Sequence, residues 1–231
     1  MPEADWVARE IVERASAVVV SVDYRLAVDP ICYPVPHDDV VAAVRGIRDR
    51  ADAFNTKPGL ISIGGASAGA NLMAGAALRL RDEDQWLPAN LILAYPLLHR
   101  ALPPAPRELV DVMNEHPEAI RFSPDLVRLL NETYVGGPVH GADAYAFPAD
   151  AALPGLGPTL ILNAEYDDLR VSGQAFAAAL AEAGVDVAQV MARGVPHGFL
   201  NEPPATASVD RTLALIAEVV ARVNRPSNVS G

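Results

Sequence analysis

A five-residue stretch, Gly65-Ala66-Ser67-Ala68-Gly69, constrains the fold of this 231-residue chain more than any other feature. It follows an apolar run at residues 60–63 that predicts a strand, and it precedes a small-residue run at 71–81 that predicts a helix. Glycines on both sides of the serine are typical of a sharp strand-to-helix turn, where a Cβ would clash with neighbouring backbone. The pattern therefore predicts a nucleophile elbow that holds Ser67 at the carboxyl edge of a sheet.

Two later motifs supply the groups that a serine nucleophile requires. The apolar run 159–163 ends in Glu165-Tyr166-Asp167-Asp168, and the strand-like run 187–191 leads into Pro196-His197-Gly198-Phe199. Each group follows a predicted strand, and serine, then acid, then histidine is the chain order of an α/β-hydrolase triad. The sequence therefore predicts that these three groups meet at one edge of the sheet.

The chemistry assigns a role to each group. A serine hydroxyl is a weak nucleophile without a base, so His197 is predicted to accept the proton of Ser67 and to return it to the leaving group. A carboxylate must hold the imidazole, and the residues alone leave three candidates open: Glu165, Asp167 and Asp168. The backbone N–H of Ala68, directly after the nucleophile, is the expected oxyanion donor.

Strand and helix patterns alternate along the chain, which predicts one α/β domain over residues 1–231, with a mostly parallel sheet and helices on both faces. The segment 98–152 is too long for an ordinary connection and is expected to be a cap insertion; it holds two helical patterns, the second opened by Ser123 and Pro124. Outside it, strands are expected at 17–22, 60–63, 91–95, 159–163 and 187–191, and helices at 6–14, 38–51, 71–81, 172–183 and 208–223.

Composition narrows the class of protein. The net charge of −11 disfavours a nucleic-acid or anionic-membrane partner. The chain has neither a membrane-length apolar run nor a signal-like start at Met1, so a cytoplasmic location is expected. The acidic pair after His37 cannot by itself surround a metal ion, and a helix start is the better interpretation. Composition leaves the oligomeric state open, and a homo-oligomer is compatible with it.

Five motifs in order, 21–27, 65–71, 143–146, 164–170 and 196–199, resemble those of the bacterial hormone-sensitive lipase family of α/β-hydrolases. The resemblance runs from about residue 6 to 223. It implies a serine carboxylesterase that acts on small-molecule short acyl esters, without metal or organic cofactor, and with a small helical cap. It also selects Asp167, the aspartate directly after Glu-Tyr, as the triad acid. Phe147, Phe199 and Leu200 are candidates for the acyl pocket.

One family motif is absent from the printed sequence: no His-Gly-Gly-Gly occurs in it. In the family this motif supplies further oxyanion donors, each worth roughly 10²–10³ in rate, and it follows a strand that lies between those expected at 17–22 and 60–63. We therefore expect the sequence to begin at an internal methionine of a longer protein and to lack N-terminal strands of the sheet. The alternative function is an impaired pseudo-hydrolase or a small-molecule-binding protein.

Overall fold

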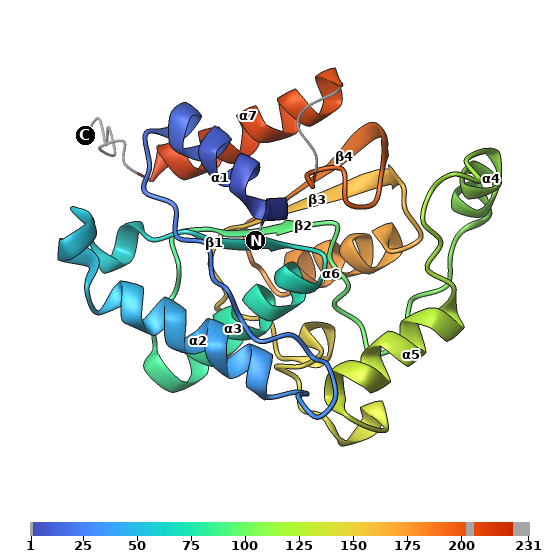
Figure 1. Ribbon diagram of the computed structural model, residues 1–231, viewed down its shortest axis with the longest axis horizontal. Helices are drawn as coiled ribbons and strands as arrows, with labels where there is room; N and C mark the ends of the chain where they lie inside the picture. The colour runs from blue at the N-terminus through green and yellow to red at the C-terminus, as the bar shows by residue number, and fades with distance from the viewer. Residues whose placement is uncertain (1, 202–205, 224–231) are drawn as a thin grey trace.

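The computed structural model describes residues 2–201 and 206–223, with side chains from residue 5 onward. Its centre is a four-stranded parallel sheet in the order β1-β2-β3-β4 (Figure 1). The strands are β1 (Ile63–Ala66), β2 (Leu91–Ala94), β3 (Thr159–Tyr166) and β4 (Val187–Pro196). The sheet is parallel, as the alternating strand and helix patterns predicted, and strands that follow one another along the chain are neighbours in it.

Seven α-helices accompany the sheet within the described residues: α1 (Pro2–Ala15), α2 (Val35–Arg48), α3 (Ala68–Asp84), α4 (Arg107–Glu115), α5 (Pro124–Val135), α6 (Arg170–Glu182) and α7 (Ala207–Arg222). Figure 1 shows α1 and α7 on one face and α2, α3 and α6 on the other. The expected helices are therefore present, with ends displaced by a few residues from those predicted.

Side-chain alternation along the strands produces two cores. Leu91 and Leu93 of β2 pack with α2, α3 and α6, whereas Ile92 and Ala94 pack with α7 and with partly buried side chains of α1. Successive residues of a strand point to opposite faces, so a strand buried on both faces is apolar throughout. This is why β2 consists of Leu-Ile-Leu-Ala with every residue buried.

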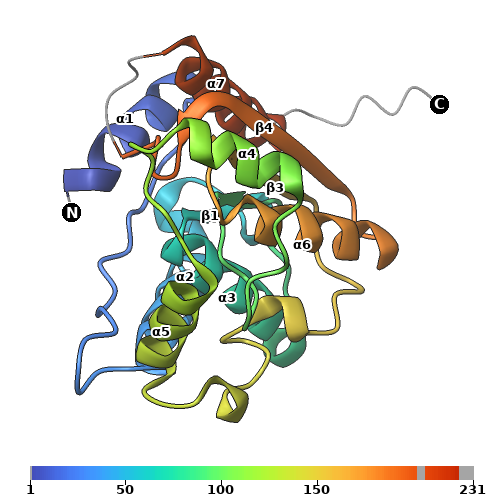
Figure 2. The same cartoon turned by 90° about the vertical axis from the view of Figure 1, so that its right-hand side faces the viewer.

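The segment 98–152 contains α4, α5 and two short 3-10 turns, and it leaves and returns to the domain between β2 and β3. In Figure 1, α4 and α5 lie at the right-hand side of the molecule, beyond the layers that cover the sheet, and in Figure 2, viewed from that side, both lie in front. Ser123 caps α5 by accepting the N–H of Leu126 at 3.2 Å, and Pro124 occupies the first turn, as predicted.

The strand expected at residues 17–22 is not present. Residues 17–20 alternate between half-buried and exposed, with Val18 65% and Val20 45% exposed, but the segment forms no ladder with another strand. A strand requires a neighbour for its N–H and C=O groups, and the described part of the chain provides none beside this segment. Within the described residues, β1 likewise pairs only with β2.

The strand expected at 60–63 starts later than predicted. Pro58–Leu60 forms a 3-10 turn, which the fixed φ of Pro58 favours, and β1 is assigned from Ile63. Hydrogen bonding to the segment that leads into β2 begins slightly earlier, because the N–H of Ala89 donates to the carbonyl of Ile61 at 2.7 Å.

Candidate active site

Ser67 lies between the end of β1 and the first residue of α3. Its backbone angles are φ 52° and ψ −116°, a conformation that a non-glycine residue adopts only when its surroundings hold it there. The N–H of Ser67 donates to the carbonyl of Ala94 in β2 at 2.9 Å, and its carbonyl accepts the N–H of Ala70 at 3.1 Å. The turn is thus fixed to both the sheet and the helix.

The two glycines of the elbow differ in their steric role. A Cβ built on Gly65 would lie 2.3 Å from the carbonyl oxygen of Gly69, so close packing of strand and helix requires glycine at this position. A Cβ built on Gly69 would meet nothing within 4 Å. The expected clash therefore exists at Gly65, and at Gly69 the described residues do not produce it.

Ser67, His197 and Asp167 form a continuous hydrogen-bonded row. Ser67 Oγ lies 2.9 Å from His197 Nε2, and His197 Nδ1 lies 2.8 Å from Asp167 Oδ2. The side chain of His197 is 8% exposed and that of Asp167 is fully buried. Among the three carboxylates that the sequence left open, Asp167 contacts the imidazole.

The other two carboxylates of this loop have different partners. Glu165 accepts the side chain of Arg193 at 2.6 Å and the N–H of Gly194 at 2.8 Å. Burial opposes ionisation of Glu165, but these two hydrogen bonds prevail and hold its pKa below the usual range. Asp168 bonds to Arg121 and to the N–H of Phe122 in the cap segment. Neither carboxylate is therefore available to the imidazole.

The chain is similar to proteins of known family. A family description, alpha/beta hydrolase fold, matches residues 1–201. The chain belongs to this family. Carboxylesterase NlhH of Mycobacterium tuberculosis is 33% identical over 221 residues, which cover 92% of this chain and 67% of the relative. Esterase LipI of the same species is 31% identical, over 94% of this chain and 67% of the relative.

Solved structures give the same result. A Pyrobaculum calidifontis esterase superposes with a TM-score of 0.85 at 32% identity, covering 96% of this chain and 71% of the esterase. EstE1, a thermostable carboxylesterase cloned from a metagenomic library, superposes equally well at 30% identity, with 96% and 74% covered. The resemblance to the hormone-sensitive lipase family of α/β-hydrolases is confirmed.

In this α/β-hydrolase, two aromatic rings contact the imidazole that Ser67 and Asp167 hold. The ring of Tyr95 lies 4.8 Å from that of His197, and the ring of Phe122 lies 4.7 Å from it, both at steep angles. Sequence reasoning missed both. Tyr95 could have been found from its position, because it ends a predicted strand at the sheet edge where the triad was expected. Phe122 comes from the cap segment, and nothing in its local sequence marks it.

The predicted oxyanion donor, Ala68, is the first residue of α3. The first N–H groups of a helix have no acceptor within the helix, and the positive end of the helix dipole lies there. Ala68 itself is exposed and directly follows Ser67. This geometry suits the predicted role, which remains a prediction.

The predicted acyl-pocket residues lie in two places. Phe199 packs on Tyr95 with ring centroids 5.2 Å apart, and Leu200 belongs to the same buried cluster on the α7 face of the sheet. Phe147 is 1% exposed and lies under the guanidinium of Arg100, 4.6 Å from the ring centroid. Phe199 thus adjoins the aromatic contacts of the triad histidine, while Phe147 belongs to the packing of the cap.

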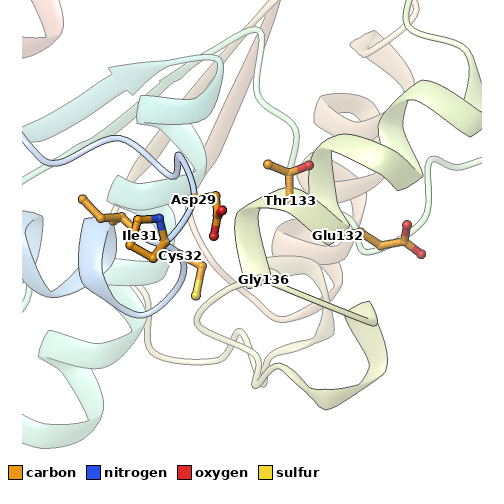
Figure 3. Close-up of a pocket in the computed structure, with 7 residues that line it drawn as sticks. Asp29, Ile31, Cys32, Glu132, Thr133 and Gly136 are labelled. Atoms are coloured by element: carbon orange, nitrogen blue, oxygen red, sulfur yellow. The ribbon is translucent and has the colours of Figure 1, made fainter.

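A separate hollow of about 380 Å³ lies between the loop before α2 and the end of α5. Asp29, Cys32, Thr133 and Gly136 are among its lining residues, and the close-up shows Glu132 directed away from Asp29 (Figure 3). No triad residue lines it.

Among the described residues, no cluster of histidine, cysteine or acidic side chains could hold a metal ion, and no helix has the length and apolarity to cross a bilayer.

Proposed function

We propose that this carboxylic-ester hydrolase acts on short acyl esters through a Ser67 nucleophile and an acyl-enzyme intermediate. The observation that carries the proposal is the unbroken hydrogen-bonded row from Ser67 Oγ through both nitrogens of His197 to Asp167. The names of these relatives, carboxylesterase and esterase, support the same substrate class.

In the first half of the reaction, Ser67 Oγ attacks the ester carbonyl while His197 Nε2 takes its proton. Asp167 holds the proton on Nδ1 and stabilises the imidazolium that forms. When the tetrahedral intermediate collapses, the C–O bond to the alcohol breaks, and Nε2 returns the proton to the departing alkoxide. The acyl group remains on Ser67.

In the second half, water replaces the alcohol. His197 removes a proton from the water, the resulting oxygen nucleophile attacks the acyl-serine, and the proton returns to Ser67 Oγ as the carboxylic acid leaves. In both halves the N–H of Ala68 donates to the negatively charged carbonyl oxygen, which develops charge only in the transition state and intermediate.

The proposal is tested with p-nitrophenyl acetate and butyrate and with a fluorophosphonate that labels activated serines. We expect steady release of nitrophenol, a burst equal to one equivalent of enzyme when deacylation is slower than acylation, and a phosphonylated peptide containing Ser67. Ser67→Ala should lose both labelling and at least about 10⁴-fold in kcat. Glu132→Gln, which changes a partly exposed carboxylate paired with Arg128 in α5, is the matched control.

The alternative, a non-catalytic protein that binds small molecules, gives a different result. It predicts saturable ester binding without nitrophenol release and without phosphonate labelling in the unaltered chain. That result would overturn the proposed mechanism, whereas labelling of Ser67 together with turnover would exclude the alternative.

A further inference from the structure

The segment joining α4 to α5, residues 116–122, lies against the loop that carries the triad acid. The ring of His116 stacks on Tyr166 with centroids 3.6 Å apart and an interplanar angle of 20°. At the other end of the segment, Phe122 contacts the imidazole of His197. We call residues 116–122 the strap. It connects the cap insertion to the catalytic loop at both of its ends.

Asp168 is the group that fastens the end of the strap nearest the triad. Its Oδ2 accepts the N–H of Phe122 at 2.8 Å and the Nε of Arg121 at 3.0 Å, and Arg121 Nη2 lies 3.4 Å from Oδ1. The side chain of Asp168 is only 13% exposed. This carboxylate directly follows the triad acid but has no part in the proton transfers derived above.

We propose that Asp168 is a positioning residue, which holds Phe122 against the catalytic imidazole and so makes triad geometry depend on the docked cap. The proposal rests on the proposed role of His197. It gives a role in the reaction to the Asp168 carboxylate, beyond its ion pair with Arg121, and to the phenyl ring of Phe122 in the cap insertion.

The need for such a contact follows from the reaction itself. The imidazole exchanges its Nε2 partner during each half-reaction, from Ser67 to the leaving alkoxide and from water back to Ser67. While Nε2 changes partner, its hydrogen bond does not hold the ring, and among the described contacts Asp167 and the packing of Phe122 and Tyr95 still restrain it. A displacement of about 1 Å in a catalytic group costs on the order of 10²-fold in rate.

The two bonds of Asp168 make unequal contributions. Arg121 is 49% exposed, so solvent screens its ion pair. The N–H of Phe122 belongs to a half-buried residue and fixes the backbone that carries the phenyl ring. Asparagine at 168 keeps an acceptor oxygen for this N–H, whereas alanine removes it. Asp168→Asn and Asp168→Ala therefore separate the role of charge from the role of the acceptor.

The kinetic test is a double-mutant cycle with p-nitrophenyl butyrate. Asp168→Ala and Phe122→Ala should each lower kcat about tenfold and change KM less than threefold, because both displace the imidazole rather than the bound ester. The double variant should be no slower than Phe122→Ala alone, because Asp168 acts through Phe122. Asp168→Asn and the control Glu132→Gln should stay within threefold of the unaltered enzyme. Additive losses would overturn the proposal.

A second measurement needs no turnover. Hydrogen–deuterium exchange should rise in Asp168→Ala both in the strap and in peptides covering 194–200, and should be unchanged in Glu132→Gln. A rise confined to the strap would show that Asp168 does not position His197 and would overturn the proposal. If the unaltered chain showed no esterase activity, the proposed function would fail, while the exchange result would still decide whether Asp168 couples the strap to His197.

Discussion

Replacing Asp167 with asparagine tests the triad at its most buried point. The Asp167 carboxylate accepts two donors, His197 Nδ1 at 2.8 Å and the N–H of Leu169 at 2.9 Å. An asparagine amide has one acceptor oxygen and one NH₂ group, so it can satisfy only one of these donors. If its oxygen faces Leu169, its NH₂ faces Nδ1, the imidazole proton moves to Nε2, and His197 cannot accept the proton of Ser67.

The opposite amide orientation sets the NH₂ group against the buried N–H of Leu169, which costs about 1–3 kcal/mol. The inactive tautomer is therefore favoured by about this amount. The imidazolium also loses the negative charge that stabilises it. Together these effects should lower kcat by roughly 10³–10⁴-fold, as expected when a triad carboxylate becomes an amide.

The assay is hydrolysis of a short-chain p-nitrophenyl ester, with thermal unfolding measured on the same samples. Asp168→Asn is the matched control, since it makes the same change one residue along the chain and should be mild. A larger loss in Asp168→Asn than in Asp167→Asn would refute the assignment of the acid. So would an Asp167→Asn variant that kept a tenth or more of the activity while remaining folded.

Two further predictions concern stability. Gly65→Ala should lower the free energy of unfolding by at least about 1–3 kcal/mol, because its Cβ would overlap backbone atoms of α3. Gly69→Ala should be neutral or stabilising in thermal unfolding. Equal destabilisation of the two variants would contradict this. Burial lowers the pKa of His37 and of His99 below 6.5, so the unfolded chain binds more protons than the folded chain as pH falls through that value. The melting temperature should therefore fall between pH 7.5 and 5.5, and His99→Gln should reduce that fall; a melting temperature that rose on acidification would reverse the sign.

Much of the site was predictable because its determinants are local. A glycine-flanked serine after an apolar run, and polar residues at the ends of later strands, define positions along one sheet edge without knowledge of tertiary contacts. The choice of Asp167 over its neighbours needed the family resemblance. In the structure the choice corresponds to which of these carboxylates contacts the histidine that follows β4.

The errors came from properties that local sequence does not contain. Residues 17–22 have the β-branched, apolar composition of a strand, but a strand exists only where another segment supplies hydrogen-bond partners. Phe122 approaches His197 only because the strap folds back over the catalytic loop, and the 74 positions between them carry no periodic signal that reports this contact. The motif predicted a steric need for glycine at both Gly65 and Gly69. Within the described residues, a Cβ would clash at Gly65 and would meet nothing at Gly69.

The partners of residues 165–168 alternate: Glu165 and Asp167 bond to β4 and the histidine after it, whereas Tyr166 and Asp168 contact the strap. Inserting or deleting one residue here would reverse this alternation, so that a side chain that now contacts the strap would face the imidazole instead. The length of this loop is therefore fixed, while α4 and α5 can vary in length if the strap is retained. If the cap of another esterase were transplanted onto this protein, the junctions should therefore leave residues 116–122 and Asp168 of this chain in place.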